Sequence, residues 1–341
     1  MTRTLRVWTT AAFVVCLAYQ PSAAQQPPPG VGPNGENGGY TAKFADINGV
    51  RTRYYEEGSG EPMLLVHGSG FAGTASANTW VPVLGLLAER FHVYAPDKLA
   101  SGMTGNPKSD DDLNIRGEVQ HMVDFIQTMK LAPVHLIGQS RGGGLAFLLA
   151  VNHPELVKTL VIVDSSTAAP GAGDDRSNRR RNLLEHCPQE PPTALWPCQQ
   201  AALLYDRSVV TPDFAAAATF MENQPKAQET DRRMTPEVRR KSGLIQAEMN
   251  YDAYRRIDVE GVLQMPVLLF WGKNDPSVLP IQGEELFNII AETNPHARLL
   301  FINRAGHFHY REHPEEFAHT VTSFIDYWNG PGAKELTAAG R

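Results

Sequence analysis

The sequence lacks two features that would point to a nucleic-acid or nucleotide ligand. It has no long basic run, and its glycine-rich stretches do not have the spacing of a dinucleotide-binding loop. The 341 residues carry a formal net charge of −6. Two basic clusters, at 176–181 and 239–241, have acidic residues nearby, which is typical of solvated helix faces. We therefore expect no nucleic-acid partner and no nucleotide cofactor.

Cysteine is also scarce, with three residues in the whole chain. One of them, Cys16, lies in a segment with the features of an export signal. Arg3 and Arg6 precede an apolar stretch at 11–18, and small residues follow up to Ala24. The apolar stretch is too short for a permanent membrane span, and the residue before Cys16 is larger than a lipidation site requires. We expect cleavage after Ala24, no stable membrane insertion, and a periplasmic or secreted mature protein.

The two remaining cysteines, Cys187 and Cys198, lie close together in a proline-rich stretch. An oxidising compartment would allow them to form a disulfide, whereas without oxidation they would be two free thiols. A metal site would need more ligands than the neighbouring His186 supplies, so we expect no metal here.

Short, almost continuously apolar runs alternate with helical stretches from Tyr40 onward. This pattern predicts the α/β class, with a mostly parallel central sheet and helices on both faces. The predicted strands are 63–66, 92–95, 134–137, 160–163, 267–271 and 298–302.

The same pattern predicts the domain organisation. It stops near Ser165 and resumes at Val267, so residues 40–164 and 263–330 form the expected core, with 165–262 inserted as a helical lid. Residues 1–24 are the expected signal peptide. Residues 25–39 consist largely of Pro, Gly, Asn and Gln and are expected to form a flexible linker, and 331–341 a C-terminal tail.

A short motif, Gly138-Gln139-Ser140-Arg141-Gly142, joins the strand at 134–137 to a small apolar helix. Flanking glycines permit the strained turn that exposes a serine at the carboxyl edge of a sheet. The amide of Arg141, at the start of the helix, then points to the same place and can stabilise an oxyanion. We therefore predict Ser140 as a nucleophile and Arg141 as an oxyanion-hole residue.

A serine nucleophile needs a base, and the base needs an orienting acid. His307 follows a glycine on the loop after the strand at 298–302 and is the predicted base. Asp275, on the turn after the preceding strand, is the predicted acid, and Asp164 is its competitor. The nearby His309 and His313 are expected at the surface rather than as metal ligands.

A second oxyanion donor is expected on an earlier loop. The strand at 63–66 leads into His67-Gly68-Ser69-Gly70. The amide of Ser69 is the predicted donor, and Gly68 and Gly70 allow the backbone to approach a substrate oxygen.

Together, H-G-S-G, G-Q-S-R-G, G-K-N-D and A-G-H resemble the α/β-hydrolase superfamily, in the family's order, over residues 40–328. Within it, the chain is similar to the meta-cleavage product hydrolases, which break a carbon–carbon bond in vinylogous 1,5-diketones from aromatic catabolism. The shared stretches are Ala77-Asn78, Pro96-Asp97-Lys98, Thr104-Gly105-Asn106-Pro107 and Leu204-Tyr205-Asp206-Arg207-Ser208. The resemblance implies an α/β-hydrolase fold, an acyl-enzyme mechanism without a cofactor, and substrate contacts from Asn78 and Gln139.

Several positions depart from that subfamily. Gln139 and Arg141 flank the nucleophile where Asn and Met are usual, and Phe308 follows the catalytic histidine at the substrate site where Trp is usual. The lid arginine that holds the substrate carboxylate falls near Ala218, in a run of alanines. Arg141 is either an anion anchor that replaces this arginine or a solvent-facing helix residue.

The sequence thus predicts an exported serine hydrolase that acts on a carboxylic ester, because export and the missing lid arginine argue against a cytoplasmic dienoate pathway. Carbon–carbon bond hydrolysis of meta-cleavage products is the alternative. A non-catalytic binding protein on the same fold is the alternative of another class, and it would require degraded catalytic residues. The expected partner is a small-molecule substrate. The oligomeric state stays open, a homo-oligomer included.

Overall fold

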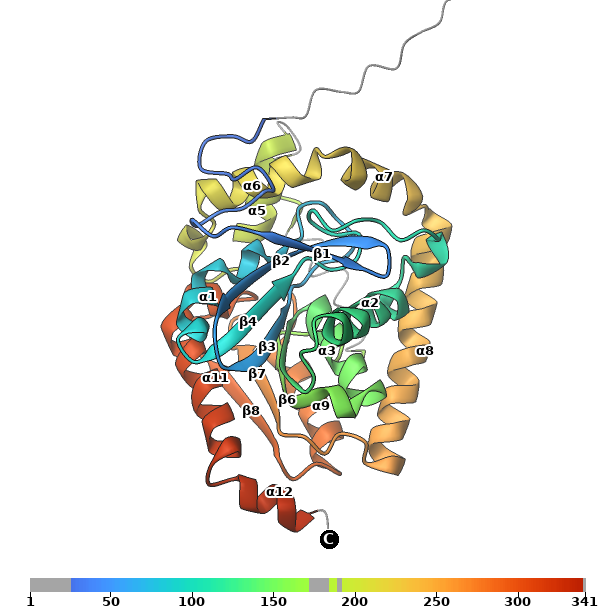
Figure 1. The fold of residues 1–341 in the computed structure, drawn as a ribbon, viewed down its shortest axis with the longest axis vertical. Helices are drawn as coiled ribbons and strands as arrows, with labels where there is room; N and C mark the ends of the chain where they lie inside the picture. Colours follow the sequence, from blue (N-terminus) through green and yellow to red (C-terminus); the bar gives the residue numbers. More distant parts are fainter. Residues whose placement is uncertain (1–25, 172–183, 189–191, 340–341) are drawn as a thin grey trace, which may run out of the picture.

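A computed structural model describes residues 26–171, 184–188 and 192–339 (Figure 1). The predicted export signal and its cleavage site lie outside these residues. Within them, no helix combines the length and the apolar character needed to cross a membrane.

An eight-stranded sheet forms the centre of the molecule, in the order β1-β2-β4-β3-β5-β6-β7-β8. The strands β1 and β2 pair antiparallel, β2 pairs antiparallel with β4, and all other neighbours are parallel. The strands are β1 Lys43–Ile47, β2 Val50–Gly58, β3 Glu61–Val66, β4 Phe91–Pro96, β5 Val134–Gln139, β6 Val157–Val163, β7 Val267–Gly272 and β8 Ala297–Ile302. The mostly parallel sheet confirms the predicted fold class.

Helices cover both faces of the sheet, because its central strands are apolar on both sides. Successive side chains alternate between two cores: Leu64 and Leu136 pack in one, and Leu65 and Ile137 in the other. One face is covered by α2 (Ile115–Thr128), α3 (Arg141–Asn152), α8 (Pro236–Glu260) and α9 (Pro280–Ala291), and the other by α1 (Val81–Ala88) and α11 (Pro314–Asn329) (Figure 1).

Parallel strands bring several loops to one edge of the sheet. The carboxyl ends of β3, β5, β6, β7 and β8 lie side by side because these strands pair in parallel. The loops that begin at His67, Ser140, Asp164, Lys273 and Asn303 therefore leave the sheet at this edge. In α/β sheets this is the edge where ligands bind.

Helices make up much of the described part of the segment between β6 and β7. It contains α5 (Pro192–Ala201), α6 (Pro212–Glu222), α7 (Pro225–Arg233) and α8. The first three helices gather at one end of the molecule (Figure 1). The last helix differs from an expected lid helix, because Ala253 and Ile257 in its second half pack into the core beside α3.

The N-terminal segment is packed, which makes the expectation of a flexible linker at 25–39 wrong for most of its length. Val31 is buried against Phe220 and Met221 of α6. The carbonyl oxygen of Gly35 accepts a hydrogen bond from Asn78 Nδ2 at 2.7 Å. The buried carboxylate of Glu36 accepts hydrogen bonds from Asn34 N, Asn34 Nδ2 and Ala42 N. A few anchoring contacts thus order a stretch whose composition alone suggests none.

The C-terminal tail carries one more helix, α12 (Ala333–Ala339), and α10 (His309–Glu312) precedes α11. The hydroxyl of Tyr327 on α11 donates to Glu335 of α12 at 2.6 Å.

Candidate active site

Ser140 occupies a strained turn between β5 and α3. Its backbone angles are φ 53° and ψ −122°, a conformation that non-glycine residues rarely adopt. A side chain at Gly138 would meet the Gly142 carbonyl oxygen, and one at Gly142 would meet the Val66 carbonyl oxygen. The two flanking glycines are therefore required by the close approach of strand and helix, and the turn presents Ser140 at the carboxyl edge of the sheet.

His307 and Asp275 are joined by a short hydrogen bond at the same edge. Asp275 Oδ2 lies 2.6 Å from His307 Nδ1, and both residues are buried. Donation of the Nδ1 proton to this carboxylate leaves Nε2 free to accept a proton. Ser140 and His307 line one cavity of about 750 Å³.

The carboxylate of Asp275 is held by its own turn. Its Oδ1 accepts hydrogen bonds from Ser277 N at 2.7 Å, Ser277 Oγ at 3.0 Å and Val278 N at 2.9 Å. The backbone of His307 is held as well, because its N–H donates to Leu203 and its carbonyl oxygen accepts from Gln139 Nε2 at 3.0 Å.

Asp164, the competing acid, contacts a different histidine. Its Oδ1 accepts from Gly272 N at 2.8 Å, and its Oδ2 lies 3.3 Å from His309 Nε2. Burial, together with the negative charge of Asp275, raises the pKa of Asp164 well above its usual value. The expectation that His309 lies at the surface is wrong: it is fully buried, and burial lowers its pKa to about 3. It packs between Asp164 and the aromatic rings behind the site.

Ser69 and Gly70 line the same cavity as His307, and Gly68 lines a smaller pocket that Ser69 also borders. A side chain at Gly68 would meet Gln139 Oε1 and Ser140 Cβ, so the loop can contact the nucleophile turn only with glycine there. Ser69 itself has a φ of 61°. Nothing lies within 4 Å of the place where a Gly70 side chain would begin, so this glycine borders open space.

His67 holds this loop in place through two hydrogen bonds. Its Nε2 accepts from the Lys98 amide at 3.0 Å, and its Nδ1 donates to the Gly68 carbonyl oxygen at 2.9 Å. Burial and the nearby charge of Lys98 lower the pKa of His67 well below its usual value, so the ring is neutral and can make both bonds.

The predicted substrate contacts divide into two groups. Gln139 and Phe308 line the cavity, and the ring of Phe308 lies 4.9 Å from that of His307. Asn78 does not line it, and its expected role is wrong. Its Oδ1 accepts from Arg53 and Tyr55, and its Nδ2 donates to Gly35, so a buried network uses both lone pairs of the oxygen and one of the two N–H groups.

The side chain of Arg141 lines the cavity and is 17% exposed, so it does not face solvent freely. It is held by Glu118 of α2, which in turn contacts Lys98. Glu118 was not among the residues predicted from the sequence. A signal exists, because Glu118 falls on the apolar face of its helix with Ile115, Val119 and Met122, where a charge needs a partner.

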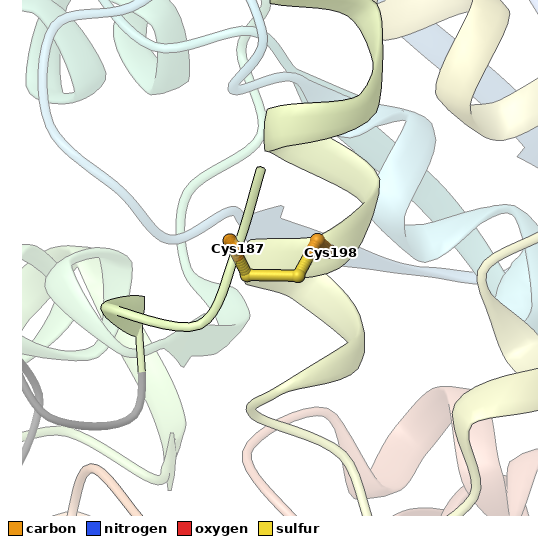
Figure 2. Close-up of a disulfide and its surroundings, with 2 residues drawn as sticks. All are labelled: Cys187 and Cys198. Carbon is orange, nitrogen blue, oxygen red and sulfur yellow. A yellow bond between two sulfur atoms is a disulfide. The ribbon is translucent and has the colours of Figure 1, made fainter. Parts of the chain in front are cut away.

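Cys187 and Cys198 form a disulfide, with their Cα atoms 5.6 Å apart, as predicted for an oxidising compartment (Figure 2). It ties the short segment 184–188 to helix α5. Leu184 from this segment and Gln200 from α5 both line the cavity, so the disulfide fixes part of its wall. Among the described residues, no group of His, Cys, Asp and Glu side chains has the arrangement of a metal site.

Comparisons with known proteins agree with the fold. The model of the Alpha/beta hydrolase family matches residues 63–320. The 2-hydroxy-6-oxo-6-(2'-aminophenyl)hexa-2,4-dienoic acid hydrolase of Metapseudomonas resinovorans is 28% identical, with 84% of this chain and 91% of that protein covered. The 2-hydroxymuconate semialdehyde hydrolase of Pseudomonas sp. (strain CF600) is 29% identical, with 81% and 91% covered. The solved structure of the meta-cleavage product hydrolase CumD, from Pseudomonas fluorescens, superposes with a TM-score of 0.67, 26% identity and 83% and 97% coverage.

Proposed function

The chain belongs to the α/β-hydrolase family, and from this premise we propose that it hydrolyses a carbon–carbon bond next to a ketone in a vinylogous 1,5-diketone. One observation carries the chemical part of the proposal. A strained serine and a histidine paired with a buried carboxylate line the same cavity. The similarity to meta-cleavage product hydrolases, which extends through the inserted helices, favours this reaction over the ester hydrolysis expected from the sequence.

In the proposed mechanism, His307 Nε2 removes the proton of Ser140 as Oγ attacks the ketone carbon. The carbon–carbon bond then breaks, and the leaving fragment departs as a dienolate whose charge is delocalised over the conjugated system. His307 returns the proton to that fragment, which leaves an acyl-enzyme on Ser140. Water, activated by His307, attacks the acyl-enzyme and releases the acid.

Asp275 orients the imidazole in this mechanism and stabilises the imidazolium that forms. Its three donors from the 277–278 turn keep the carboxylate in place. The amides of Ser69 and Arg141 are the proposed oxyanion donors. Each such donor contributes roughly 3 to 4 kcal/mol to transition-state stabilisation in serine hydrolases.

The first experiment compares turnover of a ring-fission dienoate and a short-chain 4-nitrophenyl ester by the purified mature protein. Preference for the dienoate is the expected result. Ser140→Ala should lower both rates by at least about 10³-fold, because Ser140 occupies the strained turn between β5 and α3 and supplies the proposed nucleophile. Circular dichroism of the variant checks that it is folded. Residual activity near that of wild type would overturn the assignment of Ser140.

Ester hydrolysis is the second candidate, because the same machinery can expel an alkoxide. Its supporting observation is the helix α6, where the buried Ala218 stands near the position of the lid arginine of carbon–carbon hydrolases. Ester turnover without dienoate turnover would establish this candidate. If neither substrate reacted with wild type, the chain would be a binding protein on this fold.

We propose in addition that the chain is exported and cleaved after Ala24. The disulfide between Cys187 and Cys198 supports this proposal, since disulfides persist in oxidising compartments. The mass of the protein from a periplasmic or culture fraction should correspond to a chain that begins at Gln25. A full-length mass in the cytoplasmic fraction would contradict it.

A further inference from the structure

A buried ion cluster connects the two proposed oxyanion residues. Glu118 Oε1 accepts from Lys98 Nζ at 2.9 Å, and Glu118 Oε2 accepts from Arg141 Nε at 2.9 Å. Lys98 Nζ also donates to the Ser69 carbonyl oxygen at 2.7 Å. The side chains of Lys98 and Glu118 are 0% exposed, whereas Arg141 reaches the cavity.

The charges in this cluster do not balance. Burial raises the pKa of Glu118, but the charges of Arg141 and Lys98 outweigh it and hold that pKa below its usual value. Glu118 is therefore a carboxylate with two cationic neighbours. Burial lowers the pKa of Lys98, and the ion pair with Glu118 opposes that shift. Among the described residues no second carboxylate pairs with Lys98 or Arg141, and Arg141 is the cation that faces the cavity.

The described residues that line the cavity do not compensate the positive charge of Arg141. None of the described residues that line the cavity is an aspartate or a glutamate, and Arg141 is the one lysine or arginine among them. The cavity wall also includes the uncharged polar residues Ser166, Thr167 and Gln200. A neutral, apolar acyl group would not make use of this arrangement.

The guanidinium also keeps free hydrogen-bonding capacity. Of its five N–H groups, Nε donates to Glu118 and one on Nη1 donates to Gln246 at 3.1 Å. Nη2 lies 2.7 Å from Glu118 Oε2 in an ion pair and has no hydrogen-bond partner in the described residues. The Phe71 ring, 5.4 Å from the guanidinium carbon, packs on the group from one side. The side chain is thus fixed in position. Because Nη2 is buried, the second N–H group of Nη1 is the donor that remains for a ligand.

We propose that Arg141, held by Glu118 and Lys98, forms an anion subsite beside the nucleophile and selects substrates that carry a carboxylate several bonds from the reacting carbonyl. The proposal deepens the proposed function by naming the substrate class, and it rests on Ser140 as the nucleophile of that site. Bidentate or charge-assisted hydrogen bonds from arginine to carboxylate give such a site its selectivity.

Two matched esters test this subsite. Mono-4-nitrophenyl glutarate and 4-nitrophenyl pentanoate have the same leaving group and chain length, and differ by a carboxylate in place of a methyl group. We expect wild type to prefer the anionic ester by about tenfold or more in kcat/KM. Arg141→Met should abolish that preference, and it leaves Lys98 and Glu118 as a balanced pair.

A control variant makes the same chemical change elsewhere. Arg116 lies on the exposed surface of α2, paired with Glu248, outside the cavity. Arg116→Met should keep the wild-type ratio of the two esters. A wild-type ratio near one, or a ratio that Arg141→Met leaves unchanged, would overturn the subsite.

Binding to Ser140→Ala gives a second measurement that does not depend on turnover. Monomethyl glutarate should bind at least about tenfold more tightly than methyl pentanoate in calorimetric titrations, and adding Arg141→Met should remove the difference. Equal affinities would overturn the proposal. The outcomes also separate the two proposals: an anionic preference without dienoate turnover keeps the subsite and rejects carbon–carbon hydrolysis, whereas dienoate turnover without an anionic preference does the reverse.

Discussion

Asp164 and Asp275 follow the neighbouring strands β6 and β7, and both are buried, but their surroundings differ. Asp275 has three donors on one oxygen and His307 on the other. Asp164 has one backbone donor, and its second oxygen has no hydrogen-bond partner in the described residues. The number of hydrogen-bond partners, rather than depth of burial, thus distinguishes the two carboxyl groups.

The histidines add to this difference. His307 is proposed to exchange protons with the substrate, and it has a carboxylate at Nδ1 and the cavity on its other side. His309 is enclosed, with its pKa lowered to about 3 by burial, and so it stays neutral beside Asp164. Two similar acid–histidine pairs lie next to each other, and only one of them can reach a substrate.

The largest expected effect comes from Asp275. Asp275→Asn replaces the carboxylate with an amide that cannot stabilise an imidazolium and favours the wrong tautomer of His307. We expect kcat to fall by about 10³ to 10⁴-fold, measured on whichever substrate wild type hydrolyses. The thermal unfolding midpoint serves as the control for folding. A loss of less than about tenfold would remove Asp275 from the proposed triad.

A much smaller effect is expected at Asp164. Asp164→Asn keeps the oxygen that accepts from Gly272 N, and the side chain does not contact His307. We expect kcat to change by less than about tenfold, because this group contacts the Gly272 turn and His309 rather than the proposed base. If this variant lost more activity than Asp275→Asn, the roles of the two acids would be exchanged.

The smallest effect is on the pH dependence of stability. The pKa of Asp164 is raised in the folded protein, mainly by burial, so the folded state binds its proton more tightly than the unfolded state. The stability from this group is fully present below the unfolded pKa of about 3.9 and is lost as pH rises through the folded pKa. Between the unfolded pKa and the folded pKa, the free energy of unfolding of wild type should fall relative to Asp164→Asn by up to about 1.4 kcal/mol per pH unit.

Urea titrations of both proteins from about pH 4 upward measure this difference. His309 contributes a slope of opposite sign, because its lowered pKa makes the unfolded state bind more protons, and this slope is present in both proteins. A difference that stays constant with pH would mean that Asp164 is ionised in the folded protein as it is in the unfolded chain.

Much of the fold follows from local signals. The apolar runs predict the parallel strands of the core, and the glycines around Ser140 predict the strained turn, since each depends on residues adjacent in the chain. The disulfide was one of two alternatives, and the structure contains it. The packed segment at 26–39 was missed, because a single apolar residue, Val31, and a carbonyl group anchor it to partners far away in the sequence.

The candidate site likewise has one part that the sequence predicts and another that only the tertiary structure shows. By itself the sequence determines which chemical groups stand at the carboxyl ends of the strands, because the positions of the strands along the chain and the chemistry of the turns are encoded locally. The tertiary structure alone decides their partners: Asp275 contacts His307 while Asp164 contacts His309, Asn78 is enclosed in a buried network, and Lys98, Glu118 and Arg141 meet from three separate elements. These contacts depend on distances of a few ångströms between distant parts of the chain, and a pattern of residue types along the sequence does not contain them.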